Sequence, residues 1–311
     1  MKYLVTGGAG FIGANLCRRL LGDGHSVICL DDLSTGKYKN VEELNTNSKF
    51  EFLDHDLTKP FFPDSIDAIF NLACPASPVH YQYNPIRTLK MGTLAIYNVL
   101  GMAHKQNVPL LQASTSEVYG DPQEHPQSES YWGHVNPIGP RACYDEGKRV
   151  AEALCLAYRN YSNTSVRIAR IFNTYGPFMD RNDGRVVSNF IIQALTGEQL
   201  TVYGDGSQTR SFCYIDDQVE GLVRLMNSEY ESPMNIGNPS EINILELAAT
   251  VREIVGSDVN ITNKPLPQDD PVKRCPDISL AKEVLDWTPQ VSLKEGLKLS
   301  VDWFRGNLNK N

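Results

Sequence analysis

The stretch Gly7-Gly8-Ala9-Gly10-Phe11-Ile12-Gly13 lies between an apolar segment, residues 3–6, and an amphipathic segment, residues 12–21. We expect the first segment to form a buried strand and the second to form a helix. The glycines fit two spacings, Gly-x-Gly-x-x-Gly from Gly8 and Gly-x-x-Gly-x-x-Gly from Gly7. Because glycine has no Cβ, the backbone can turn tightly and approach a pyrophosphate, which the free N–H groups of the helix N-terminus would bind. The stretch therefore predicts the first strand–turn–helix unit of a dinucleotide-binding sheet.

An acidic pair, Asp31-Asp32, follows this turn near the ~20-residue offset typical of dinucleotide-binding units. A carboxylate there would accept hydrogen bonds from the adenosine ribose and repel a 2′-phosphate, so the pair favours NAD over NADP. Asp56 is a candidate adenine contact, and a helix cap is an equally good interpretation of it. The candidate cofactor-binding residues are Gly7, Gly10, Phe11, Ile12, Gly13, Asp31, Asp32, Thr35, Gly36, Asp56, Leu57, Leu72, Tyr144 and Lys148.

Short apolar and amphipathic segments alternate through the first 170 residues, which predicts right-handed crossovers and a parallel sheet covered on both faces. The predicted strands are residues 3–6, 26–30, 49–53, 67–72, 109–113 and 165–168, and the predicted helices are residues 12–21, 88–104 and 145–161. We expect an α/β fold with a Rossmann-type doubly wound parallel sheet, and an NAD-binding Rossmann domain over residues 1–170.

The pattern changes after about residue 170. Loops rich in Gly, Asn, Asp and Pro appear at 173–185 and 203–210, and shorter helices are predicted at 244–255 and 293–304. We expect residues 171–311 to form mainly a smaller C-terminal substrate-binding domain, with some segments returning to the first domain.

The composition excludes several classes of protein. A net charge of -8 argues against nucleic-acid binding, which needs clustered Lys and Arg. The seven cysteines show no Cys-x-x-Cys spacing and the six histidines are dispersed, so the spacing predicts reduced thiols in a cytoplasmic protein and no metal site. We also expect no signal peptide, because residues 2–6 already contain the first predicted strand, and no membrane contact, because no apolar run approaches membrane-spanning length.

Tyr144 and Lys148 lie four residues apart at the start of a predicted long helix, so their side chains share one face. A phenol with a pKa of ~10 is a poor base at neutral pH. A nearby ammonium and a cationic nicotinamide ring would both favour the phenolate, so we expect the pKa of Tyr144 to be lowered. Tyr144 would then take a proton from a substrate hydroxyl as the carbon is oxidised. Taken alone, the motif is also compatible with an exposed helical pair.

Together with the glycine turn, this pair resembles the extended short-chain dehydrogenase/reductase superfamily, and the resemblance covers essentially all 311 residues. Within it, Ser114-Thr115-Ser116-Glu117-Val118-Tyr119-Gly120 is similar to the UDP-glucuronate decarboxylases, also called UDP-xylose synthases. The related dehydratases carry Thr-Asp-Glu at this strand end, and simple 4-epimerases usually lack the glutamate. Similar strings are found at residues 75–78, 83–86, 141–149, 182–190 and 206–210.

The resemblance implies NAD-dependent decarboxylation of UDP-glucuronate to UDP-xylose through C4 oxidation, β-keto acid decarboxylation and C4 re-reduction. The implied catalytic residues are Tyr144, Lys148, Thr115, Glu117, Ser116 and Arg210. Tyr144 would be the base and later the acid, and Lys148 would tune it and hold the nicotinamide ribose. Thr115 would bond the C4 oxygen, and Arg210 would orient the substrate carboxylate. That carboxylate should raise the pKa of Glu117.

Each of these roles has a simpler alternative. Glu117 could cap the following turn, and Arg210 could form a surface ion pair. The Ser116 hydroxyl could form hydrogen bonds only with backbone groups. The implied substrate-binding residues are Lys90, Asn173, Arg185, Asn189, Tyr203, Arg210 and Arg274.

Tyr203 could instead be a core tyrosine, and Lys90 could lie on a solvated helix face.

Two positions depart from the family. Phe178 stands where arginine is usual, and Arg181 could supply the missing positive charge. Asp205 stands where a small serine is usual. These departures bear on the sugar and phosphate contacts.

Other functions stay open at this point: a UDP-sugar 4-epimerase, an oxidative decarboxylase that releases the UDP-4-keto-pentose, and a non-catalytic NAD-sensing protein. The last could dispense with Tyr144 and Lys148, which this chain has. The resemblance also implies a homodimer through helices near 88–104 and 145–161 packed as a four-helix bundle. Burial within one monomer would explain their amphipathic pattern equally well.

Overall fold

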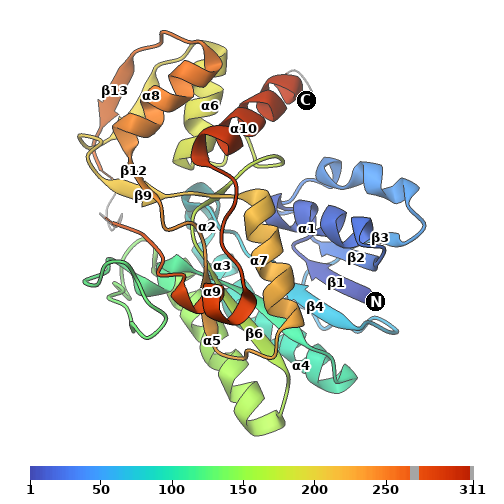
Figure 1. The fold of residues 1–311 in the computed structure, drawn as a ribbon. Coiled ribbons are helices and arrows are strands. Elements are labelled where there is room, and N and C mark those ends of the chain that lie inside the picture. The colour runs from blue at the N-terminus through green and yellow to red at the C-terminus, as the bar shows by residue number, and fades with distance from the viewer. Residues whose placement is uncertain (267–272, 309–311) are drawn as a thin grey trace.

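A parallel sheet of seven strands forms the centre of the fold, with the strand order β11-β6-β5-β4-β1-β2-β3. The computed structural model describes residues 1–266 and 273–308. Figure 1 shows this sheet below a second group of helices. The strands of the sheet are β1 (Lys2–Thr6), β2 (Ser26–Asp31), β3 (Phe50–Asp54), β4 (Ala68–Asn71), β5 (Leu110–Thr115), β6 (Val166–Ile171) and β11 (Pro233–Ile236). The predicted doubly wound α/β fold is confirmed.

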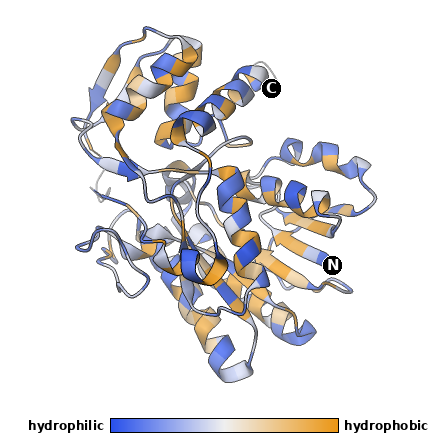
Figure 2. Cartoon of the chain, viewed as in Figure 1, coloured by the Kyte–Doolittle hydropathy of each residue, from blue (hydrophilic) through white to orange (hydrophobic). Residues whose placement is uncertain are grey.

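Helices cover both faces of this sheet. They are α1 (Phe11–Gly22), α4 (Ile96–Gln106), α5 (Ala142–Ser162) and α7 (Ile215–Asn227). Helices α1 and α7 pack on one face, and α4 and α5 pack on the other. Successive strand side chains enter different cores: Val5 joins the α1 side, whereas Leu4 joins the α4 side. Because both faces are buried, the inner strands β1 and β4 are mostly apolar, whereas the edge strand β3 has the exposed residues Glu51 and Asp54. Figure 2 shows apolar residues gathered on the sheet.

The segment predicted as one helix over 88–104 is divided in the structure. It consists of α3 (Pro85–Lys90), a π-helical turn η3 (Met91–Ala95) and then α4. A Cβ added to Gly92, in the π turn, would lie 2.7 Å from the Cα of Gly147 in α5. The two backbones therefore approach closely at a pair of glycines, and the local change of helix type accompanies that contact.

The second half of the chain builds a smaller group of elements, seen at the top of Figure 1. Helices α6 (Val186–Thr196), α8 (Ile244–Val255) and α10 (Leu293–Asn307) pack on one another. Local capping starts two of them, because Asn243 accepts a hydrogen bond from Glu246 N and Ser292 accepts one from Glu295 N.

Three short strand pairs among the described residues lie outside the central sheet. They are β8 (Leu200–Tyr203) with β13 (Ile261–Lys264), β9 (Thr209–Ser211) with β12 (Glu241–Asn243), and β7 (Thr174–Tyr175) with β10 (Cys213–Tyr214). Not all of the second half belongs to the smaller group, because α7 packs on α1 and β11 pairs with β6 in the central sheet. Among the described residues, no helix combines the length and the apolar character needed to cross a membrane.

Candidate active site

A cavity of about 1120 Å³ lies between the carboxyl ends of the central strands and the second group of helices. Gly7 and Leu72 reach it from the ends of β1 and β4, and Thr115 reaches it from the end of β5. Asn189 of α6 lies on the opposite wall. This is the edge at which doubly wound sheets bind ligands.

The glycine turn forms one wall of the cavity. Gly7, Gly10 and Gly13 line it, whereas a Cβ on Gly8 would meet the sulfur of Cys29 in the core. Gly7 has a φ of +66°, and a Cβ on Gly13 would lie 2.2 Å from the Gly7 carbonyl oxygen. Substitution at either position is therefore sterically excluded, which fits the close backbone approach that a dinucleotide pyrophosphate needs.

The acidic pair holds the turn as well as facing the cavity. Asp31 accepts hydrogen bonds from the N–H groups of Ala9 (3.0 Å) and Leu33 (2.9 Å), and a Cβ on Gly36 would lie 2.7 Å from its carboxylate oxygens. Asp32 is ion-paired with Arg87. Each carboxylate oxygen can accept more than one hydrogen bond, so Asp31 can support the turn and still bind a ribose hydroxyl.

Most of the predicted cofactor-binding residues line this one cavity. They are Gly7, Gly10, Phe11, Ile12, Gly13, Asp31, Asp32, Thr35, Leu57, Leu72, Tyr144 and Lys148. Gly36 lies against Asp31 instead, and Asp56 is not part of the wall. Asp56 accepts hydrogen bonds from the N–H (3.0 Å) and hydroxyl (2.8 Å) of Thr58. It stabilises a turn and is not a helix cap, because none of the helices among the described residues begins there.

Tyr144 and Lys148 lie on the first turns of α5 and are both buried, so they are not an exposed helical pair. The ammonium of Lys148 lies 5.7 Å from the centroid of the Tyr144 ring and donates to the Ala113 carbonyl at 2.8 Å. Thr115, at the end of β5, shares a side-chain hydrogen bond with Tyr144. On its other side, the Tyr144 ring stacks on Tyr81 with centroids 5.0 Å apart.

The protein's own groups do not lower the pKa of Tyr144, although Lys148 was expected to contribute to such a lowering. Burial raises the pKa of the Tyr144 phenol, with a further contribution from Cys74, and the hydrogen bond with Thr115 only partly opposes this. Lys148 does not reverse the direction, because its ammonium points to the Ala113 carbonyl. The other predicted source of positive charge is the nicotinamide ring.

Glu117 lies in a short helical turn, η4 (Ser116–Tyr119), directly after β5. Its carboxylate pairs with Arg141 at 2.7 Å and with both terminal nitrogens of Arg274 at 2.8 Å. The alternative that Glu117 caps the turn is wrong, because the hydroxyl of Thr115 accepts the Glu117 N–H instead, at 3.2 Å. Glu117 therefore organises two arginines at the cavity wall.

The predicted rise of the Glu117 pKa depends on a bound substrate carboxylate, and the protein's own groups act in the opposite direction. Burial alone would raise it, but Arg274 and Arg141 outweigh burial and lower the pKa of the carboxyl, and Arg210 acts in the same direction. For neighbouring Asp145, burial and the charge of Glu117 raise the pKa to about 8. At neutral pH this cluster contains three guanidinium cations, the Glu117 carboxylate and a mostly protonated Asp145, which favours an anionic ligand.

Arg210, in β9, is buried and lines the same cavity as Tyr144, so it is not a surface ion pair. It donates to the Thr209 carbonyl at 2.8 Å. Tyr203 is 38% exposed and lines the cavity, which excludes a core role. Lys90 is exposed at the end of α3 and is not part of the wall. The other predicted substrate-binding residues on the wall are Asn173, Arg185, Asn189 and Arg274.

Of the two positions that depart from the family, Phe178 lines the cavity and Asp205 does not. Phe178 has a φ of 69°, and its ring lies 3.8 Å from the guanidinium carbon of Arg18. Arg181 lines the cavity and donates to the Leu308 carbonyl at 3.3 Å. Asp205 instead accepts hydrogen bonds from the N–H (3.0 Å) and hydroxyl (2.7 Å) of Ser207 and stabilises its own turn.

Sequence reasoning assigned no role to three residues of this site. They are Tyr81, which stacks on Tyr144, Arg141, which pairs with Glu117, and Asp145. The one available signal was position, since Arg141 and Asp145 flank Tyr144 at the start of α5. Tyr81 comes from α2 (Pro78–Tyr83), which no motif connects with the tyrosine.

Comparison with known proteins agrees with this geometry. Residues 3–237 match the model of the NAD dependent epimerase/dehydratase family. UDP-glucuronic acid decarboxylase 1 of Xenopus tropicalis is 55% identical over 307 residues, which cover 99% of this chain and 73% of that protein. UDP-glucuronic acid decarboxylase 1 of Arabidopsis thaliana is 52% identical over 308 residues, covering 99% of this chain and 71% of that one.

Solved structures are similar over nearly the whole chain. UDP-glucose 4-epimerase of Thermotoga maritima, with UDP-glucose, has a TM-score of 0.90 and 30% identity and covers 99% of this chain and 100% of its own. UDP-glucuronic acid 4-epimerase of Bacillus cereus, in complex with UDP-glucuronic acid and NAD, has a TM-score of 0.88 and 29% identity. The match covers 98% of this chain and 99% of that one. The cofactor is NAD, as predicted, and the chain belongs to the NAD dependent epimerase/dehydratase family, within the extended short-chain dehydrogenase/reductase superfamily.

Proposed function

We propose that this protein is a UDP-glucuronate decarboxylase that forms UDP-xylose and CO2. The observation that carries the proposal is the cluster in which Arg141, Arg210 and Arg274 surround Glu117 at the wall that also contains Tyr144. A 4-epimerase acting on a neutral sugar has no carboxylate to orient, whereas a buried excess of guanidinium groups suits a carboxylate ligand. The similarity to the decarboxylases of Xenopus and Arabidopsis supports the same substrate.

Tyr144 acts at the C4 oxygen of the sugar in this proposal. Bound NAD supplies the oxidising and then the reducing equivalents at C4. The phenol of Tyr144 accepts the proton of the 4-hydroxyl and later returns it, and Thr115 holds the C4 oxygen by a hydrogen bond. Lys148 keeps its place through the Ala113 carbonyl and binds the nicotinamide ribose.

Loss of CO2 follows from the ketone at C4, which is beta to the carboxylate. The C5–C6 bond breaks, its electron pair moves onto the C4 oxygen as an enolate, and a proton is then added at C5. Arg210 orients the carboxylate and stabilises the enolate. Arg141 and Arg274 keep Glu117 ionised, and the Glu117 carboxylate in turn holds these two arginines in position at the cavity wall. Ser116 lines the same wall.

We propose that residues 171–311, apart from α7 and β11, form the nucleotide-sugar lobe, and that residues 1–170 form the NAD lobe. Asn173 and Arg274 would bind the diphosphate, and Tyr203 would line the uracil pocket. Their position on the wall facing the glycine turn supports these roles.

Exposed apolar side chains support a homodimer. Tyr97 of α4 is 56% exposed, Leu94 of η3 is 48% exposed, and Val150 of α5 is 40% exposed. These elements pack side by side, so a partner could cover them as a four-helix bundle. We also propose a cytoplasmic location, which the seven free cysteines support.

Incubation of the protein with UDP-glucuronate and NAD tests the function. We expect CO2 and UDP-xylose with no net rise of NADH absorbance. Stoichiometric NADH with CO2 would instead indicate an oxidative decarboxylase that releases the 4-keto pentose. Isomerisation without CO2 would indicate a 4-epimerase, and tight NAD binding without any product would indicate an NAD sensor.

A further inference from the structure

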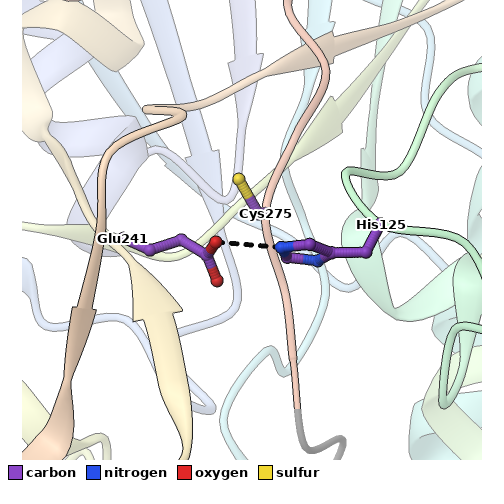
Figure 3. A group of neighbouring side chains, drawn as sticks. All are labelled: His125, Glu241 and Cys275. Carbon is purple, nitrogen blue, oxygen red and sulfur yellow. Dashed lines mark hydrogen bonds and ion pairs between the residues drawn. The ribbon is translucent and has the colours of Figure 1, made fainter.

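His125, Glu241 and Cys275 converge outside the wall of the active-site cavity. Each offers one ligand atom, and these three atoms lie within 4.8 Å of one another. The imidazole Nε2 of His125 lies 2.9 Å from a carboxylate oxygen of Glu241. Figure 3 shows the sulfur of Cys275 beside this pair. The spacing along the chain does not reveal the group, because its members are more than 30 residues apart.

Three separate segments supply these side chains, and hydrogen bonds hold each segment in place. The N–H of Gln127, two residues after His125, donates to the Cys275 carbonyl, and the Cys275 N–H donates to the side-chain oxygen of Gln127, both at 2.9 Å. Glu241 lies in β12, and its second carboxylate oxygen accepts from the Thr209 hydroxyl at 2.7 Å. The hydroxyl of Ser211, in β9, donates to the Arg274 carbonyl at 3.3 Å and so connects the Glu241 strand pair with the Cys275 segment.

We propose that His125, Glu241 and Cys275 bind a zinc-class divalent transition-metal ion, with water in the fourth position. Imidazole nitrogen, thiolate sulfur and carboxylate oxygen are the ligand atoms that zinc takes. Neighbouring ligand atoms of a tetrahedral site lie about 3.5 Å apart, so small side-chain rotations would close the group around an ion. Magnesium and calcium prefer oxygen ligands throughout, which makes the thiol selective against them.

Solvent can reach this site. The side chains of His125 and Glu241 are 33% and 28% exposed, so both can adjust their rotamers, whereas Cys275 is only 5% exposed and its position is set by the backbone. A metal ion would join the 121–130 loop to β12 and to the segment after Arg274. We therefore expect occupancy to stabilise the fold.

Cobalt(II) titration of tag-free, chelator-treated full-length protein tests the proposal, because cobalt thiolates give a charge-transfer band that carboxylate and imidazole ligands do not. We expect one cobalt per chain, a thiolate band, its displacement by zinc, and a higher melting temperature with zinc but not with magnesium. Cys275→Ser should abolish the band. Loss of one ligand should weaken zinc binding at least as much as loss of an outer-shell partner, which is about 10-fold to 100-fold.

His125→Ala and Glu241→Gln provide independent tests of the other two ligands and should each weaken zinc binding. Matched controls are His134→Ala, an exposed histidine outside the group, and Cys155→Ser, a buried thiol of α5. Both controls should retain the band and the zinc affinity. The proposal is overturned if folded protein binds no cobalt, or if the band survives in Cys275→Ser. In either outcome the contact between His125 and Glu241 is a hydrogen bond that serves no metal ion.

Discussion

Arg274 binds Glu117 through both terminal nitrogens of its guanidinium, each 2.8 Å from a carboxylate oxygen, although 157 residues separate the two in the chain. Arg141 adds a third contact to the same carboxylate at 2.7 Å. Because all three groups are buried, the charges interact without strong solvent screening. This arrangement keeps Glu117 ionised and sets two cations at the cavity wall.

Glu117→Gln should remove the charge that organises these arginines. We expect turnover of UDP-glucuronate to fall by about 10²–10³-fold, a size typical of losing a preorganised electrostatic contact at a reacting centre. The free energy of unfolding should fall by no more than about 3–5 kcal/mol, the cost of leaving a buried ion-pair partner uncompensated. CO2 release and urea unfolding measure the two effects.

Glu152→Gln is the matched control for that substitution. Glu152 is a buried carboxylate paired with Arg170 at 2.8 Å and does not line the cavity. It should lose stability to a similar degree while keeping its turnover per folded molecule. Undiminished turnover in Glu117→Gln would remove Glu117 from the mechanism.

Tyr144→Phe should abolish proton transfer at C4 and leave the fold intact. The Phe ring preserves the stack on Tyr81, whose centroid lies 5.0 Å away, so the melting temperature should change little. We expect turnover to fall by about 10²–10⁴-fold while NAD binding, measured by fluorescence titration, persists. Tyr158→Phe, on the same helix, should retain full activity, and normal turnover in Tyr144→Phe would exclude the phenol as the base.

Stability should depend on pH through Asp145. Its pKa in the folded protein is about 8, against an ordinary value of 3.8, chiefly because of burial and the charge of Glu117. Between these pH values the folded state holds a proton that the unfolded state has released, so a rise in pH favours unfolding. The contribution is complete below about pH 4 and is lost as the pH rises to 8.

Asp145→Asn removes this titration. We expect its melting temperature relative to the native protein to rise steadily from pH 5 to about pH 8 and then level off. Thermal unfolding across that range measures the difference. A constant difference at all pH values would show that Asp145 is ionised in the folded protein throughout.

Gly13→Ala should disrupt the cofactor turn, because its Cβ would lie 2.2 Å from the Gly7 carbonyl oxygen. We expect NAD affinity to fall by at least 100-fold and the thermal shift produced by NAD to disappear. Gly22→Ala, at the other end of α1, meets no atom within 4 Å and should be stabilising by about 0.5–1 kcal/mol with unchanged NAD affinity. Equal NAD affinity in both variants would refute the assignment of the turn.

Tyr97→Glu should dissociate the proposed dimer, because a buried interface excludes an uncompensated charge. Light scattering after size exclusion should give twice the mass of the 34.7 kDa chain for the native protein and the monomer mass for the variant. Leu299→Glu places the same charge on the 45% exposed Leu299 of α10 and should stay dimeric. A native protein that elutes as a monomer would refute the interface.

Much of the first half of the fold was predictable from sequence. The strands β1 to β6 and the helices α1 and α5 were predicted within a few residues, because hydrophobic periodicity and glycine spacing reflect local backbone geometry. Helices α6 and α7 and strand β11 were not identified. In particular, β11 pairs with β6, which lies more than 60 residues earlier in the chain. A local sequence pattern does not indicate which distant strand will be the neighbour.

The residue types of the site could be read from motifs, but their electrostatic states could not. Tyr144, Lys148, Thr115 and Glu117 line one cavity. Spacing predicted that Tyr144 and Lys148 share a helix face, and the family resemblance implied the other two. The protein's own groups raise the pKa of Tyr144 and lower that of Glu117, whereas the opposite shifts were predicted for a site that also holds nicotinamide and a substrate carboxylate. A pKa depends on burial and on charges within a few ångströms, and here the decisive charge of Arg274 comes from a distant part of the chain.

The sequence by itself determined the order of strands and helices along the first 170 residues, the dinucleotide turn and the Tyr144–Lys148 pair, because each depends on residues close together in the chain. Tertiary structure alone decided that Glu117 faces Arg141 and Arg274, and that His125, Glu241 and Cys275 meet. Such contacts depend on how separate segments pack, and backbone periodicity carries no information about that.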